Sequence, residues 1–102
     1  MTTFRARQIE ERLRDRLAAV HVEVVDHSAR HADHPGAQGG GHFAVLVVSA
    51  RFEGATRVAA QRLVYDALAD LMARDIHALQ MRTMTPAQWA GWEREGGRWE
   101  TA

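Results

Sequence analysis

The sequence contains no cysteine and no lysine among its 102 residues, and it has only two prolines. Without cysteine the chain cannot form a disulfide framework, a thiol nucleophile or a metal site built from its own thiolates. A metal ion would have to be held by histidine and carboxylate side chains. Net charge is also missing, because thirteen arginines balance thirteen acidic residues. The chain as a whole therefore does not attract nucleic acid or an anionic membrane by charge alone.

Long apolar segments are absent as well. The longest apolar run, Phe43 to Val48, is too short to cross a membrane, and the charged segment Met1 to Arg16 lacks the apolar core of a signal peptide. We therefore expect a cytoplasmic protein with no membrane partner. The length supports one domain, and 46% hydrophobic with 25% charged residues is typical of a folded one.

Helical periodicity occurs in two regions. Apolar residues every three or four positions predict an amphipathic helix from Thr3 to Val20, and helical structure from Ala55 to about Ala73, either as one long helix or as two joined by a kink. Thr85-Pro86-Ala87-Gln88 forms a capping box and predicts a short helix through Trp92. The two apolar stripes consist of Ile9, Leu13, Leu17 and Val20, and of Val58, Val64, Ala67, Leu68, Leu71 and Met72.

Three segments are typical of strands. Val22 to Val25 is rich in β-branched residues, and Phe43 to Val48 is apolar throughout, which predicts a central strand. Ala78 to Met84 alternates, with Leu79 and Met81 on one side and Gln80 and Arg82 on the other. The element order predicts an α+β fold of helix, strand, strand, one or two helices, strand and helix, with a three-stranded sheet covered by helices.

Histidine is concentrated in one segment. Four of the six histidines, His27, His31, His34 and His42, lie in or beside a segment from His27 to Gly41 that has no bulky apolar residue and should form a long loop. His31 and His34 could bring two imidazoles and the Asp33 carboxylate to one metal ion. Spacing alone favours a polar loop with scattered histidines over a metal site, because this pattern in a loop lacks the fixed geometry of a helical pair.

Several strings, in order along the chain, resemble the BolA family. They are Val24-Val25-Asp26, Gly41-His42-Phe43, Val47 to Gly54, Arg62-Leu63-Val64-Tyr65, Ile76-His77-Ala78-Leu79, and Arg82 to Pro86 with Trp89. The resemblance covers roughly residues 5–92. It implies a BolA-like fold, similar to the class II KH arrangement, over residues 1–93, with a histidine-rich loop at 27–42 and a flexible tail at 94–102.

The resemblance also implies a function. BolA proteins work with monothiol glutaredoxins in iron–sulfur trafficking or iron and redox sensing, and the histidine of the Ile-His-Ala-Leu string, here His77, is the expected cluster ligand. The second implied ligand is His31, with His34 as its alternative. A [2Fe-2S] cluster needs four ligands, so two imidazoles supply half of them. The glutaredoxin cysteine and a glutathione thiol would supply the other half.

A second implied function is that of a DNA-binding transcriptional regulator, as some family members are described. The candidate phosphate contacts are Arg51, Arg57 and Arg62. Ala60-Gln61-Arg62 stands where the family commonly shows a basic Arg-His-Arg run, so this region is less positive here. No nucleophile–base pair, carboxylate dyad or cofactor motif is present, which predicts a protein that is not an enzyme. We expect a monomer or a weak homodimer when the chain is alone.

The remaining aromatic and histidine residues carry structural expectations. Trp89 and Trp92 are three positions apart and should pack on the sheet from one helix face. His42, next to Phe43, is predicted to be a structural or interface residue, and His21 a surface residue. Trp99 has no predicted role.

Overall fold

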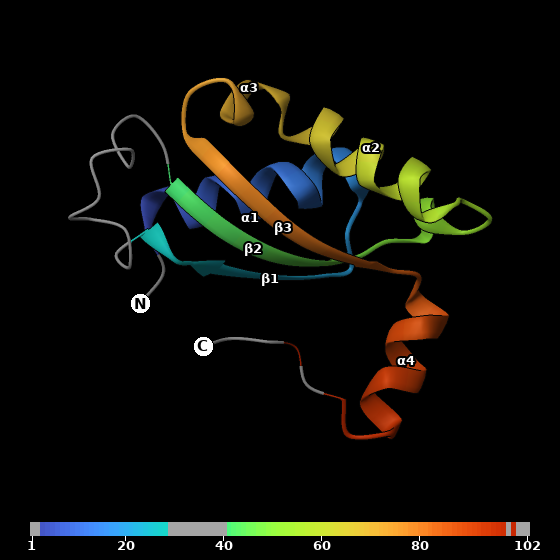
Figure 1. The fold of residues 1–102 in the computed structure, drawn as a ribbon. Helices are drawn as coiled ribbons and strands as arrows, with labels where there is room; N and C mark the ends of the chain where they lie inside the picture. Colours follow the sequence, from blue (N-terminus) through green and yellow to red (C-terminus); the bar gives the residue numbers. More distant parts are fainter. Residues whose placement is uncertain (1–2, 29–40, 98, 100–102) are drawn as a thin grey trace.

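The computed structural model describes residues 3–28, 41–97 and 99. Its sheet has the strand order β1-β2-β3, and Figure 1 shows α1, α2 and α3 on one side of this sheet with α4 on the other. The elements are α1 (Phe4–Leu17), β1 (His21–Asp26), β2 (Gly41–Val48), the short 3-10 helix η3 (Ala50–Phe52), α2 (Arg57–Ala67), α3 (Ala69–Met72), β3 (Ile76–Met84) and α4 (Pro86–Arg94). The predicted α+β fold and element order are confirmed.

Strand β2 is the centre of the sheet, as its apolar run predicts. It pairs with β1 in the antiparallel sense and with β3 in the parallel sense. A parallel pair needs a crossover connection, and η3, α2 and α3 supply it. Because both edges of β2 are hydrogen-bonded and both faces are covered, its residues from Val45 to Val48 are 0% exposed.

The main core lies between the sheet and the first two long helices. Ile9, Leu13 and Leu17 of α1 meet the β2 side chains that point to the helix face, such as Val45 and Val47. The predicted alternation of β3 is also confirmed, since Leu79 and Met81 pack against this core while Gln80 and Arg82 are exposed. Other buried members include Val22, Phe43, Phe52, Ala60, Val64, Ala67, Leu68, Leu71 and Ile76.

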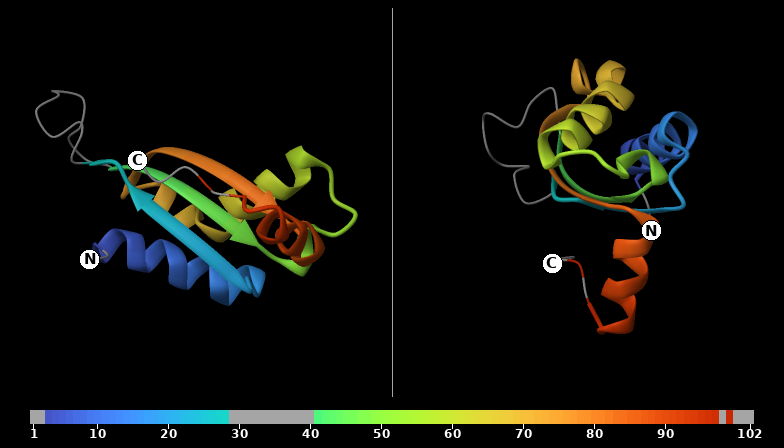
Figure 2. Two further views of the ribbon diagram at one scale, coloured as in Figure 1. Left: turned by 90° about the horizontal axis from the view of Figure 1, so that it is seen from below. Right: turned by 90° about the vertical axis from the view of Figure 1, so that its right-hand side faces the viewer.

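A smaller apolar cluster covers part of the opposite face of the sheet. Leu46, Val48 and Met84 form its buried centre, and the side chains of Trp89, Trp92 and Trp99 pack against it. The expectation that Trp89 and Trp92 pack on the sheet is therefore confirmed. Helix α4 begins with the predicted capping box, in which the Thr85 hydroxyl accepts from the Gln88 amide. Figure 2 shows that α4 extends away from the side occupied by α1 and α2.

Two expectations about the helices were wrong in detail. The first helix ends at Leu17 rather than Val20, because Ala18 adopts the left-handed conformation with φ of 49° and turns the chain toward β1. Val20 is consequently 61% exposed. In the crossover, the predicted alternative of two joined helices is confirmed, because the helix breaks at Leu68 into α2 and α3. Val58, which was expected in the apolar stripe, is instead 58% exposed in the first turn of α2. The predicted loop at 27–42 is shorter on its far side, since β2 begins at Gly41.

Charged side chains attach α1 to the crossover helices. Asp70 accepts hydrogen bonds from Arg12 at 2.9 Å and from Arg16 at 3.3 Å. Arg16 also donates to the Ala67 carbonyl at the end of α2. The hydrogen bond from Arg12, opposed by burial and assisted by the nearby arginine charges, holds the pKa of Asp70 below its ordinary value.

Ser49 joins three elements at the end of the central strand. Its side chain is fully buried, its hydroxyl donates to the Leu17 carbonyl at 2.6 Å, and it accepts from the Arg51 amide at 3.0 Å. The hydroxyl therefore satisfies the end of α1 and the start of η3 together. A buried polar group with two such bonds is costly to remove, since both partners lose their pairing without gaining water.

We predict that Ser49→Ala lowers the free energy of unfolding by about 2 kcal/mol, because the Leu17 carbonyl and the Arg51 amide lose their shared partner. Urea denaturation followed by circular dichroism measures this change. The exposed neighbour Glu53 provides the control, and Glu53→Ala should shift stability by less than about 0.5 kcal/mol. Equal effects of the two substitutions would contradict the role given to Ser49.

Candidate histidine site

His77 lies at the start of β3 on an irregular stretch of the sheet. Gly41 pairs with Ile76 and His42 pairs with Ala78, so the register shifts by one residue and His77 is the extra one. Such bulges redirect a side chain relative to the regular pleat. Ile76 is buried at the start of the strand, and the His77 side chain is exposed to solvent.

The ring of His42 lies beside that of His77. The two ring centroids are 5.1 Å apart and the rings are tilted by 42°. His42 was expected to be a structural or interface residue, and the structure makes it the neighbour of the predicted ligand. Sequence reasoning missed this pair because the strings that contain the two histidines are more than thirty positions apart, and only the parallel pairing of β2 with β3 brings them together.

Residues 27–28 and 41–42, at the two ends of the histidine-bearing segment, are held together by a polar clamp that consists of His27, Ser28, Gly41 and His42. The Ser28 hydroxyl accepts from the His42 amide at 3.2 Å, and the His27 amide donates to the His42 carbonyl at 2.7 Å. Gly41 is required here, because a Cβ at this position would collide with the Ser28 hydroxyl and the Phe43 ring. The Gly41 amide also donates to the Asp75 carbonyl at 3.0 Å, which ties the loop root to the residues just before His77.

Asp26 supports this clamp from the end of β1. Its carboxylate accepts from the Ser28 amide at 2.8 Å and from the Thr3 hydroxyl at 3.0 Å. Burial works to raise the pKa of Asp26, but the hydrogen bonds from Ser28 and Thr3, with the charge of Arg5, hold it below its ordinary value of 3.8. The ionised form of Asp26 is thus the one that fixes Ser28.

The two predicted loop ligands, His31 and His34, lie outside the residues that the structure describes, as do Gly36, Gly39 and Gly40. Within residues 3–28, 41–97 and 99, no group of three histidine or acidic side chains is arranged to hold a metal ion. The described part of the candidate site therefore consists of the His42 and His77 imidazoles and the clamp beside them.

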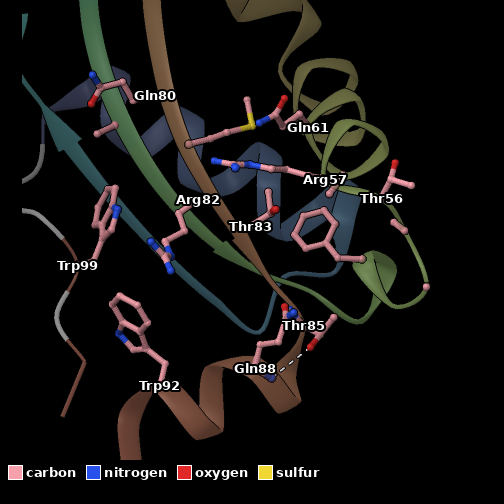
Figure 3. Close-up of a pocket in the computed structure, with 16 residues that line it drawn as sticks. Thr56, Arg57, Gln61, Gln80, Arg82, Thr83, Thr85, Gln88, Trp92 and Trp99 are labelled. Atoms are coloured by element: carbon pink, nitrogen blue, oxygen red, sulfur yellow. Dashed lines mark hydrogen bonds between the residues drawn. The ribbon is translucent and has the colours of Figure 1, made fainter. Parts of the chain in front are cut away.

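The three candidate phosphate-binding arginines are spread along η3 and α2. Arg51 and Arg62 are exposed, while Arg57 lines a groove beside β3 in Figure 3. Arg82, which was not predicted as a contact, lines the same groove. Of the three candidates, Arg57 alone lines this groove, and it does so together with Arg82.

His21 is not the simple surface residue that was expected. Its ring stacks on Trp89 with centroids 4.4 Å apart, and its Nε2 lies 2.8 Å from a Glu23 carboxylate oxygen. Both contacts are made by side chains that share the second face of the sheet. His21 therefore helps to hold α4 against β1, at the opposite end of β1 from the His77 site.

The fold defines a class of small α+β domains, and comparisons with known proteins show the same class. The family model described as BolA-like protein matches residues 13–88. A structure of the BolA domain of SufE1 from Arabidopsis thaliana superimposes with a TM-score of 0.73 at 37% identity, covering 85% of this chain and 98% of that one. The solution structure of BolA1 from Mus musculus superimposes with a TM-score of 0.75 at 33% identity, covering 99% of this chain and 77% of that one.

Curated relatives agree with the structures. The chain is 39% identical over 84 residues to the DNA-binding transcriptional regulator BolA of Escherichia coli, covering 82% of this chain and 78% of the relative. It is 41% identical over 81 residues to human BolA-like protein 1, covering 79% of this chain and 58% of that protein's length. This chain belongs to the BolA family. In the part of it that the structure describes, no helix is long and apolar enough to span a membrane.

We predict that Asp26→Asn lowers stability by about 1 kcal/mol at neutral pH, since an ionised acceptor is lost from the Ser28 and Thr3 bonds. A carboxylate with a depressed pKa stabilises the fold above its ordinary pKa, and this contribution is lost as pH falls through the folded-state value. The difference in the free energy of unfolding between the native and the Asp26→Asn chain should therefore shrink below pH 3.8.

Urea denaturation from acid to neutral pH measures that difference. Asp15→Asn removes an exposed carboxylate from α1 and should change stability by less than about 0.5 kcal/mol over the same range. A difference for Asp26→Asn that grows toward acid pH would contradict the role assigned to its carboxylate.

Proposed function

We propose that this chain is a BolA-like adaptor that binds a monothiol glutaredoxin and shares a [2Fe-2S] cluster with it, in iron–sulfur cluster trafficking or iron and redox sensing. The observation that supports this most directly is the exposed imidazole of His77 beside the clamped root of the histidine-bearing loop. In this proposal the protein acts through binding and has no catalytic reaction of its own.

The donor set of the chain fits a shared cluster better than one held alone. The chain has no thiolate to offer, and clusters held partly by histidine keep cysteine ligands on the remaining positions. A glutaredoxin cysteine and a glutathione thiol would complete the set. Protons compete with iron for the imidazole nitrogen, so the proposed complex should lose its cluster more readily as pH falls.

His77 is the first proposed ligand and His31 the second. His31 follows Ser28 by three residues, a span of about 10 Å for extended chain, so the clamp starts the loop within reach of His77. His34 is the alternative in the same loop. The ring of His42 lies 5.1 Å from that of His77, so a test of the loop histidines must also distinguish His42 from His31 and His34 as the second ligand.

We expect His77→Ala and His31→Ala to change the visible absorption and circular dichroism spectra of the mixed complex and to accelerate cluster loss by at least about tenfold, as loss of a ligand weakens a metal site. The measurement is a titration of the chain into a cluster-loaded monothiol glutaredoxin with glutathione. His34→Ala and His42→Ala are measured in parallel, so that each imidazole is tested separately.

His21→Ala is the matched control, because it removes a histidine at the far end of β1. Its complex should show the native spectrum. A native spectrum for His77→Ala would show that His77 is not a ligand. A changed spectrum for His34→Ala together with a native spectrum for His31→Ala would assign the second ligand to His34. A complete lack of complex formation would reject the adaptor function.

DNA binding is the second candidate function, and the name of the Escherichia coli relative favours it. The chain has no net positive charge, so we expect binding that is weak and that falls steeply with salt because it rests on phosphate contacts. Fluorescence anisotropy with labelled duplex DNA should show that Arg57→Gln weakens binding and reduces the salt slope by about one. Arg7→Gln on α1 is the charge-matched control. Absence of any sequence preference at physiological salt would reject a regulatory role.

A further inference from the structure

A groove of about 870 Å³ runs beside β3, between the start of α2 and the C-terminal part of the chain (Figure 3). Four consecutive β3 residues, Gln80, Met81, Arg82 and Thr83, line it. Successive side chains of a strand point to opposite faces of the sheet. A cavity lined by all four must therefore pass around the edge of the strand, and Ala44 of β2 extends its lining onto one face of the sheet.

The backbone along this edge is open to a new partner. β3 is an outer strand, and it pairs with β2 only. Among the described residues, no group outside β2 forms a hydrogen bond with the backbone of residues 78–83. In a parallel pair half of the amides and carbonyls of an outer strand face away from its neighbour, so this edge presents unpaired donors and acceptors to the groove.

The charge of the groove has one sign. Arg57 and Arg82 both line it, and its lining includes no aspartate or glutamate, although the whole chain has equal numbers of basic and acidic residues. Neither arginine forms an ion pair in the described part of the chain. Arg57 reaches the edge from the helix layer, and Arg82 lies on the other face of the sheet with Trp92 (Figure 3).

The aromatic residues of the groove are not a free stacking platform. The Arg82 guanidinium lies 4.5 Å from the centre of the Trp92 ring. Gly97 lies so close to the same ring that a Cβ there would come within 2.6 Å of it. Trp99 packs against the cluster of Leu46 and Val48. Single-stranded nucleic acids are held by stacking bases on exposed aromatic rings, and these contacts leave little of Trp92 for that purpose.

We propose that the outer edge of β3 binds an extended, acidic segment of a partner protein, which adds to the sheet as a fourth strand. Backbone hydrogen bonds to residues 78–83 would supply affinity, and alternate side chains of the segment would point to the two faces of the sheet. Two neighbouring acidic residues could then meet Arg57 on one face and Arg82 on the other. A second copy of this chain is a poorer occupant, because its own β3 would bring another Arg82 against these cations.

This inference goes beyond the proposed function and does not depend on it. His77 does not line the groove, so binding at the edge can be measured without glutaredoxin, glutathione or iron. A negative result there leaves the cluster proposal unaffected, and a negative cluster titration leaves the groove proposal unaffected.

The probe is a capped peptide of about eight residues, a usual strand length, in which threonine and valine flank a central pair of glutamates. It is titrated to about 1 mM into the full chain, and backbone amide shifts and tryptophan fluorescence are recorded. We expect shifts concentrated at residues 78–83 together with a change at Trp92 or Trp99. Methylation of alternate peptide nitrogens should weaken binding at least about tenfold, because it removes strand donors.

The arginine variants test the charge contribution. Arg57→Gln and Arg82→Gln should each weaken binding about two- to fivefold, as expected for partly exposed ion pairs. Arg62→Gln removes the same charge from an exposed position of α2 outside the groove and should leave the affinity unchanged. A peptide with glutamine in place of the glutamate pair should bind as weakly as the native peptide binds to the doubly substituted chain.

Four outcomes of the binding experiments would overturn the proposal. They are no binding at about 1 mM, undiminished binding of the methylated peptide, amide shifts located away from β3, and tighter binding of a short thymidine oligonucleotide to the same residues. The last outcome would assign the groove to single-stranded nucleic acid. A stable dimer in sedimentation equilibrium whose interface protects residues 78–83 from hydrogen exchange would assign the edge to a second copy.

Discussion

The rest of the structure depends on the burial of one strand. β2 is hydrogen-bonded along both edges and apolar on both faces, so the chain must cover it twice. Helices α1 and α2 form the first cover, and most of the buried apolar residues pack between these helices and the sheet. The second cover is smaller and consists of three tryptophans around Leu46, Val48 and Met84. Full burial of an apolar side chain such as Leu46 or Val48 contributes about 1.5–3 kcal/mol, so the second cover matters for the stability of a small domain.

This arrangement leaves β3 with two tasks. Its buried ends, Ile76 and Met84, hold it in the fold, while its inward side chains complete the main core. The outward side chains and the free edge remain available for partners. The histidine site uses the first residues of the strand, where the bulge turns His77 outward. The groove uses the later residues. One edge strand therefore presents two separable surfaces at different positions along its length.

Much of the fold could be predicted because it follows from local pattern. Alternation fixed the faces of β3, the uninterrupted apolar run marked β2 as central, and the capping box located the start of α4. Periodicity failed at Val20 and Val58, since an apolar side chain at helical spacing does not reveal where the helix ends or which turn meets the core. The resemblance to the BolA family implied His77 as a ligand, and this role stays a prediction.

The contacts that position the candidate site could not be predicted in the same way. The pairing of His42 with His77 depends on a parallel register and a one-residue bulge, and the stacking of His21 on Trp89 depends on where α4 lies. Both are long-range consequences of packing. The groove at β3 could not be predicted either, because Arg57 and Arg82 belong to different elements and only the fold places both of them along the same edge of the sheet.

The clamp at the loop root has a consequence for how this domain can vary. The Ser28 hydroxyl and the His27 amide bond to the backbone of His42, and Asp26 holds Ser28 in place, so these bonds join the two ends of the segment without the twelve residues between Ser28 and Gly41. The entropy of closing a loop rises slowly with its length, by about 0.6 kcal/mol for each doubling. Insertions, deletions and substitutions between these anchors therefore cost the fold little. The sequence of this segment can diverge while the sheet that presents His77 stays the same.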